Sequence, residues 1–137
     1  MVGIIIVTHG KMGQGMLGSM HMITGEQAQV ATVELEEEYS PEHLSELVND
    51  ALELVDDGSG VLIMVDLFGA TPFNVSARLY LESERQIEIL TGVNLPMLVE
   101  TVVSRAENDL KSVYDIAYQA GVSGIRTLPD TIKNSKK

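Results

Sequence analysis

The chain begins its first apolar segment with Ile4-Ile5-Ile6-Val7-Thr8-His9-Gly10. Four successive β-branched residues bounded by polar and glycine positions indicate a strand that is buried on both faces, as the strands of a parallel sheet are. Ligands bind to such sheets beyond the carboxyl ends of the strands, where the chain connections change sides. Because His9 directly follows the apolar run, we expect it at this reactive edge.

A second apolar run, residues 61–65, ends in the same way, with Asp66 as its first polar residue. Elsewhere, segments with helical spacing alternate with short apolar segments. We predict helices over residues 12–23, 41–55, 72–80, 96–105 and 109–120. We predict strands over residues 4–7, 30–35, 61–65, 87–90 and 124–128. Ser40 and Thr71 are predicted N-caps, because a proline follows each of them at the first helical position.

This alternation of strands and helices predicts the α/β class. We expect a single-domain, open and mostly parallel sheet with helices on both faces, doubly wound in the flavodoxin-like manner. The domain is predicted to span residues 1–130, and residues 131–137 are expected to form a disordered tail.

The composition excludes several classes of function. The absence of cysteine excludes disulfides, thiol catalysis and thiolate metal sites. A formal net charge of −11 argues against a nucleic-acid partner, since phosphate backbones are bound mainly through Lys and Arg. No signal segment opens the chain, and no apolar run has the length of a membrane span, so we expect a cytoplasmic protein.

Polar and glycine residues gather in the loops that follow three predicted strands, at residues 8–10, 66–74 and 92–96. If the first and third strands are neighbours, His9 and Asp66 face each other across one crevice. A carboxylate that accepts a hydrogen bond from one imidazole N–H fixes the tautomer. The other ring nitrogen is then available as a nucleophile or base.

The same loops offer donors to an anion such as phosphate. Gly10, Gly69 and the helix start near Thr71 supply backbone N–H groups, and the Thr71 hydroxyl can add a further hydrogen bond. Other chemistries have weaker signals. One His and one Asp lack a third metal ligand, and the glycines of residues 10–15 match neither a P-loop nor a dinucleotide fingerprint. These residues require neither a metal nor a cofactor.

Three segments together resemble the IIA component of the mannose, fructose and sorbose family of bacterial sugar phosphotransferase systems. They are IIIVTHG at residues 4–10, GVLIMVDLFGATPFN at residues 60–74 and TGVNLPMLVE at residues 91–100. The resemblance implies that His9 accepts a phosphoryl group on Nε2 from the phosphocarrier HPr and passes it to a IIB component. That component phosphorylates a sugar during uptake through the membrane components IIC and IID.

The resemblance also assigns roles to the neighbouring residues. Asp66 would orient His9 through its Nδ1–H group, and the phosphoryl group would be held by Gly10, Gly69, Ala70 and Thr71. The family's usual Gly-Gly pair is here Gly69-Ala70, so the backbone at Ala70 is expected to avoid positive φ. The resemblance further implies a homodimer in which the last strand, residues 124–128, crosses to the partner's sheet as an antiparallel edge strand.

Three other functions are compatible with the same residues. The related phosphotransfer subunit of dihydroxyacetone kinase shares the fold and the histidine, but the sequence TPFN at residues 71–74 favours the sugar-transport branch. A small hydrolase or isomerase using His9 and Asp66 as acid and base would have a closed substrate pocket. A regulatory binding module without catalysis is the third.

Overall fold

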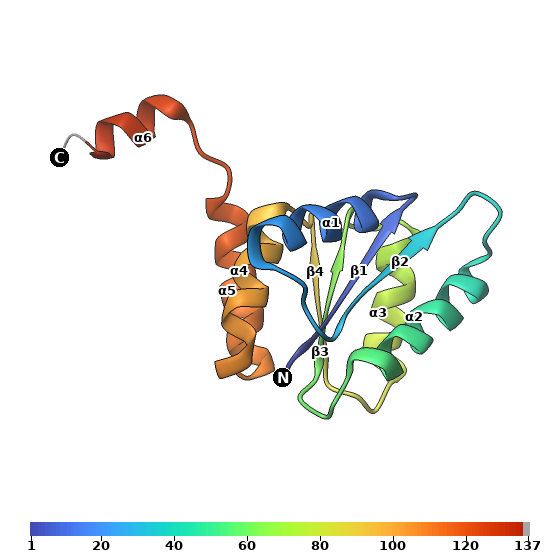
Figure 1. Ribbon diagram of the computed structural model, residues 1–137. Helices are drawn as coiled ribbons and strands as arrows, with labels where there is room; N and C mark the ends of the chain where they lie inside the picture. Colours follow the sequence, from blue (N-terminus) through green and yellow to red (C-terminus); the bar gives the residue numbers. More distant parts are fainter. Residues whose placement is uncertain (136–137) are drawn as a thin grey trace.

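The structure, a computed structural model, describes residues 1–135 (Figure 1). The strands are β1 (Gly3–His9), β2 (Val30–Leu35), β3 (Val61–Val65) and β4 (Ile87–Thr91). The helices are α1 (Met12–Thr24), α2 (Pro41–Val55), α3 (Thr71–Glu82), α4 (Leu95–Ser104), α5 (Leu110–Ser123) and α6 (Leu128–Ser135), with a 3₁₀ turn η1 (Arg105–Glu107) after α4.

The four strands form one sheet in the order β2-β1-β3-β4, and every adjacent pair is parallel. All carboxyl ends of the strands therefore lie at one edge. The chain passes from β1 to β2 on one side and returns to place β3 on the other side of β1. The gap between the ends of β1 and β3 is thus the point where strand order reverses, the usual location of ligands in open α/β sheets.

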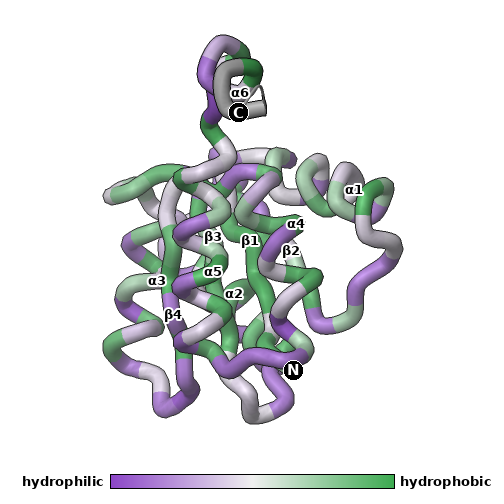
Figure 2. Tube along the Cα trace, turned by 90° about the vertical axis from the view of Figure 1, so that its left-hand side faces the viewer, coloured by the Kyte–Doolittle hydropathy of each residue, from purple (hydrophilic) through white to green (hydrophobic). Residues whose placement is uncertain are grey.

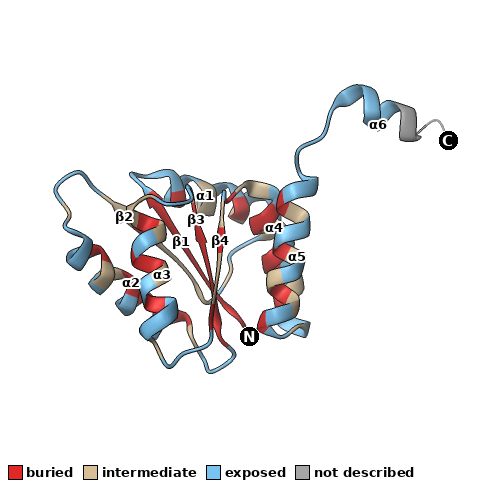
Figure 3. Cartoon of the chain, turned by 180° about the vertical axis from the view of Figure 1, so that it is seen from behind, coloured by how far each residue is buried: buried red, intermediate tan, exposed pale blue. Residues whose placement is uncertain are grey.

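Helices cover both faces of the sheet, which confirms the predicted fold class (Figures 1 and 3). Ile4 and Ile6 of β1 pack on one face with side chains of α1, α4 and α5. Ile5 and Val7 pack on the other face with side chains of α2 and α3. β1 and β3 thus separate two apolar clusters, and the hydrophobic colouring runs through the centre of the molecule (Figure 2).

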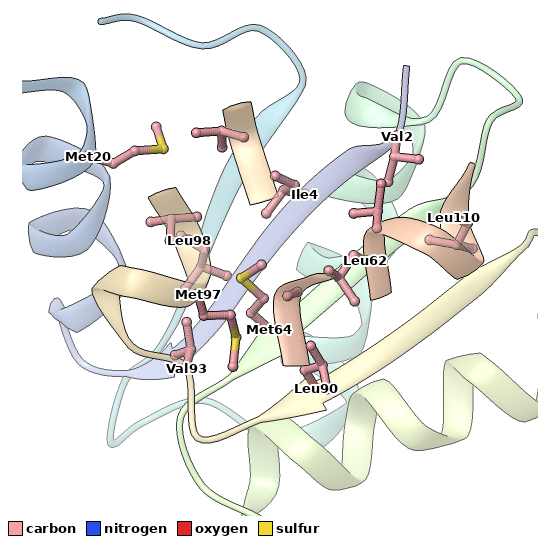
Figure 4. Packing of buried hydrophobic residues seen from close by; sticks show 14 residues of the cluster. Val2, Ile4, Met20, Leu62, Met64, Leu90, Val93, Met97, Leu98 and Leu110 are labelled. Carbon is pink, nitrogen blue, oxygen red and sulfur yellow. The ribbon is translucent and has the colours of Figure 1, made fainter. Parts of the chain in front are cut away.

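Methionine and leucine side chains fill much of the α4/α5 side of the core. Met64, Met97 and Leu98 lie together beside β1 (Figure 4). Unbranched, polarizable methionine side chains adapt to irregular gaps between a sheet and its helices. Of the apolar residues with helical spacing in α1, Met16, Leu17 and Met20 pack in this cluster, whereas Met12 and Ile23 are exposed.

Arg105 is a buried cation at the amino-terminal edge of the sheet. Its side chain is 1% exposed. Nη1 donates to the carbonyls of Val2 at 3.1 Å and Gln29 at 3.2 Å, and Nη2 donates to the carbonyl of Ala28. Burial lowers the pKa of Arg105 from its ordinary value. The guanidinium thus ties α4 to the starts of β1 and β2.

The helix starts follow the predicted signals with one correction. The Ser40 hydroxyl accepts the His43 amide at 3.1 Å, as a predicted N-cap should. Thr71 is not an N-cap: Ala70 takes that position with extended backbone, and Thr71 is the first residue of α3. Proline is tolerated in either of the first helical positions, so the Thr-Pro pair left the boundary uncertain by one residue.

The predicted last strand does not form within this chain: residues 124–128 contain no strand, and among the described residues no fifth strand joins the sheet. Gly124 ends α5 in helical backbone, and α6 begins at Leu128. Thr127 provides the helix start: its Oγ1 accepts the Asp130 amide at 3.4 Å and its carbonyl accepts the Thr131 amide at 3.2 Å. An apolar segment this short cannot distinguish a strand from a turn that leads into a helix.

In the expected tail, residues 131–135 have the helical backbone of α6. Residues 136–137 lie outside the described residues. α6 projects from the rest of the molecule, and its described side chains are exposed (Figures 1 and 3). Within residues 1–135, the helices are too short or too polar to cross a lipid bilayer.

Candidate functional site

His9 and Asp66 meet at the edge where strand order reverses. His9 is the last residue of β1, and Asp66 directly follows β3. Asp66 Oδ2 lies 2.8 Å from His9 Nδ1 and also 2.8 Å from the His9 backbone nitrogen. The two side chains therefore face each other across one crevice, as the sequence predicts. The carboxylate is hydrogen-bonded to Nδ1, the ring nitrogen nearer the backbone.

The two side chains differ in their access to solvent. The His9 side chain is 47% exposed, whereas that of Asp66 is 8% exposed. Within the described residues, no hydrogen bond engages His9 Nε2. The buried carboxylate thus holds one side of the imidazole, and the other nitrogen faces an accessible region.

Asp66 is held in its charged form. Burial raises the pKa of the Asp66 carboxyl group. The hydrogen bonds that it accepts from the His9 amide, the His9 ring and the Leu67 amide, together with the electrostatic effect of the ring, lower the pKa by more than burial raises it. The pKa of Asp66 therefore lies below its ordinary value. The Leu67 amide donates to Asp66 Oδ1 at 2.9 Å. An ionised carboxylate can only accept, so His9 Nδ1 is the donor, and in the neutral ring Nε2 carries the lone pair.

The loop between Asp66 and α3 begins directly after this pair. Gly69 has φ +82°, a conformation that glycine adopts without steric cost, while Ala70 has φ −86°, as expected from its methyl group. The Asn74 side chain donates to the Gly69 carbonyl at 3.3 Å and holds the loop against α3. In the described chain, the amides of Gly69, Ala70 and Thr71 have no protein acceptor.

Gly10 does not fit its predicted role as an amide donor to an anion. Its amide donates to the Leu35 carbonyl at 2.9 Å, which continues the hydrogen bonding between β1 and β2 beyond the last strand residue. Gly10 has φ +55°, so its place in the turn is explained by backbone conformation. The Gly10 N–H group is therefore already engaged in a hydrogen bond within the protein.

A cleft of about 620 Å³ opens beside His9, lined by residues at the ends of β1 and β2 and at the starts of α2 and α3. Lys11 supplies a cation to its wall, and acidic residues supply the opposite charge. These acidic residues are Glu34, Glu36 and Glu37. Sequence reasoning did not place Lys11 or these acids at the site, because nothing in their spacing indicates which loops the fold brings together.

Exposed apolar side chains follow Asp66 in the loop. Leu67 is 60% exposed and Phe68 is 77% exposed. The Phe68 ring contacts the ring of Phe73, with centroids 4.7 Å apart. No group of three or more potential ligands gathers among the described His, Asp and Glu residues to hold a metal ion. The site is therefore an accessible histidine surrounded by amides, charges and apolar side chains.

Comparison with known proteins agrees with this geometry. The family model EIIA-man, the fructose IIA component of the phosphotransferase system (PTS), matches residues 3–118. This chain belongs to that family. Its IIA relatives include the mannose-specific EIIAB component of Escherichia coli K12, which is 34% identical over 128 residues, or 93% of this chain and 39% of the relative. The chain therefore spans about two fifths of the length of that relative.

Other members of the IIA family match over most of their own length. The fructose-specific EIIA component of Bacillus subtilis is 33% identical over 82% of this chain and 77% of the relative. Among solved structures, the phosphotransferase component EIIA of Streptococcus agalactiae superposes with a TM-score of 0.88 and 32% identity, over 95% of this chain and 99% of the other. The fold described above is thus that of a mannose-type IIA component.

Proposed function

We propose that this chain is a phosphoryl carrier of a phosphoenolpyruvate-dependent sugar phosphotransferase system, and that His9 is the residue that carries the phosphoryl group. The observation that supports this most directly is the double contact of Asp66 Oδ2 with the amide and Nδ1 of His9. It leaves Nε2 as the one ring nitrogen with a free lone pair, in a side chain that is half exposed.

The chemistry is an in-line displacement at phosphorus. The lone pair of Nε2 forms the new nitrogen–phosphorus bond while the bond from phosphorus to the donor nitrogen breaks, and the electron pair of that bond remains on the donor. His9 Nδ1–H stays hydrogen-bonded to the Asp66 carboxylate, which stabilises the positive charge that develops on the ring. Transfer to the acceptor repeats these steps in reverse.

The loop before α3 is suited to hold the transferred group. The amides of Gly69, Ala70 and Thr71 lie at or just before the first residue of α3, where partial positive charge favours an anion. Thr71 lines the cleft beside His9, and its hydroxyl adds a further donor. Phosphoryl transfer needs positioned donors of this kind more than covalent help from the protein.

The partners follow from the carrier role. The donor is HPr and the acceptor is a IIB component, which in turn serves the membrane components IIC and IID. A carrier of this kind works in the cytoplasm, and its domain spans about residues 1–130. The exposed His9 ring favours this role over a small hydrolase or isomerase, which would enclose its acid–base pair to exclude water from the substrate.

A homodimer is part of the proposal, with its contact at the C-terminal segment around α6. α6 projects from the molecule, and the apolar residues at its start, Ile125 and Leu128, are 83% and 70% exposed. Two copies that pack these residues against each other would remove this apolar surface from water.

The carrier role is tested by incubating the protein with radiolabelled phosphoenolpyruvate, enzyme I and HPr. We expect one acid-labile phosphoryl group per chain, and none on His9→Ala. His43→Ala is the matched control, since His43 is also exposed and lies at the start of α2. Undiminished labelling of His9→Ala would remove His9 from the proposal, and absence of labelling in the wild-type protein would remove the function itself.

A further inference from the structure

We propose that Thr8 is a positioning residue that holds the backbone of His9 in place from the interior of the protein. The Thr8 side chain is completely buried, and Thr8 directly precedes His9. Its Oγ1 accepts a hydrogen bond from the Gly13 amide at 3.0 Å and donates one to the Gly10 carbonyl at 3.4 Å. The role rests on the proposed function of His9.

The hydroxyl replaces a helix cap that α1 otherwise lacks. Lys11 occupies the N-cap position of α1 and makes no side-chain capping hydrogen bond. The amides of the first helical turn have no partner within the helix, and the Gly13 amide is buried. Thr8 therefore provides this amide with its acceptor from a strand, five residues earlier in the chain.

Three hydrogen bonds thus fix the segment around His9, each to a different element. The His9 amide is held by Asp66 after β3, and the Gly10 amide is held by Leu35 of β2. Thr8 supplies the third, to α1. Without it, the start of α1 and the turn at Gly10 lose their common anchor, and the direction of the His9 ring relative to Asp66 is no longer set from this side.

The test compares Thr8→Val, which keeps the shape and removes the hydroxyl, with Thr8→Ser, which keeps the hydroxyl. We expect Thr8→Val to slow phosphoryl transfer at saturating donor by roughly 10-fold or more, because small displacements of reacting groups strongly reduce rates. The KM for phospho-HPr should change little, and Thr8→Ser should restore most of the rate.

Thr101→Val is the matched control. Thr101 is also a completely buried threonine, but its hydroxyl only donates to the Met97 carbonyl at 2.7 Å within α4. Its removal leaves no buried amide without an acceptor. Equal slowing of transfer in Thr101→Val and Thr8→Val would overturn the positioning role, because it would show a general effect of lost buried hydroxyls.

Nitrogen NMR of the His9 ring gives a readout that needs no phosphoryl transfer. We expect the Nδ1–H tautomer to dominate in the wild-type protein and in Thr8→Ser, and to lose population in Thr8→Val. If Thr8→Val does not fold, Thr8→Cys takes its place, because a thiol is a weak donor and acceptor. Ring signals unchanged from wild type in the variant that folds would contradict the inference. A wild-type protein that takes up no phosphoryl group would contradict the carrier function alone, since the ring signals would still decide the role of Thr8.

Discussion

Asp66 Oδ2 accepts two hydrogen bonds from His9, one from the backbone amide and one from Nδ1, each 2.8 Å long. A single oxygen therefore fixes both the chain and the ring of the same residue. The imidazole cannot rotate about its side-chain bonds without breaking the second contact while the first holds its backbone. The direction of Nε2 is thus set before any partner arrives.

Replacement of Asp66 should slow transfer without unfolding the protein. In Asp66→Ala the nucleophile remains, but its tautomer and direction are no longer fixed, so we expect transfer roughly 10- to 100-fold slower. Rapid-quench measurement of phosphoryl uptake from phospho-HPr gives the rate, and circular dichroism checks the fold. Uptake at the wild-type rate would remove Asp66 from the mechanism.

The loop before α3 should tolerate a methyl group at residue 70 but not at residue 69. Gly69→Ala must adopt φ near +82°, which destabilises an L-residue by about 1 kcal/mol, and relief of that strain would move the amides of Gly69 and Ala70. Ala70→Gly, at φ −86°, is the control. We expect slower transfer in Gly69→Ala but not in Ala70→Gly, measured as the initial rate of labelling. Equal rates in both variants would show that the conformation of this loop does not affect phosphoryl transfer.

Arg105 should matter for stability and not for transfer. Arg105→Met leaves three carbonyls without their buried donor, so we expect the free energy of unfolding to fall by about 2–4 kcal/mol. Urea denaturation measures this, with Arg126→Met as a control at an exposed arginine. The rate of transfer per folded molecule should match that of the wild type. A lower rate per folded molecule would show that Arg105, at the amino-terminal edge of the sheet, influences the reaction at His9.

Asp56 should contribute to the acid sensitivity of the fold. Burial raises its pKa, but hydrogen bonds from the Gly58 and Gly60 amides and from Arg85 outweigh burial and place it below the ordinary value. A carboxyl group with a lowered pKa in the folded state stabilises the protein above the unfolded pKa of about 4, and this contribution is lost as the pH falls.

Asp56→Asn should therefore reduce stability at pH 7 and flatten its decline between about pH 5 and pH 2. Urea denaturation across this range compares the variant with Glu53→Gln, which changes the net charge equally at an exposed position of α2. A decline in Asp56→Asn as steep as in the wild type would contradict the assignment.

The projecting C-terminal helix should determine the oligomeric state. A chain that ends at Gly124 lacks the exposed Ile125 and Leu128, so we expect it to be a monomer where the full chain is a dimer. Size-exclusion chromatography with light scattering measures both masses. A full chain that remains monomeric at high concentration would contradict the dimer.

The sequence predicted the elements that carry strong periodic signals. Residues 4–7 and 61–65 are continuous apolar runs, and the structure places both in the centre of the sheet. The pairing of His9 with Asp66 followed from their positions after these strands, given that β1 and β3 are neighbours. Here local pattern and topology rules were sufficient, because open parallel sheets place strand ends together.

Contacts between distant loops could not be predicted in this way. The Gly10 amide is used by Leu35, and this depends on how far the pairing of β1 and β2 continues. The partners of Arg105 are backbone carbonyls. Because every residue has a carbonyl group, the sequence does not indicate which ones a buried arginine will contact. The start of α6 did have a signal in Thr127 and Pro129, but the apolar residues around it favoured a strand.

The buried Arg105 and the exposed His9 lie at opposite edges of the same sheet, one joining strand beginnings and the other following a strand end. Arg105 contacts the carbonyls of Val2, Ala28 and Gln29, and none of these residues lies in the loops around His9. The partner specificity of such proteins can therefore change during evolution at one edge of the sheet, while the contacts that stabilise the fold at the other edge are kept.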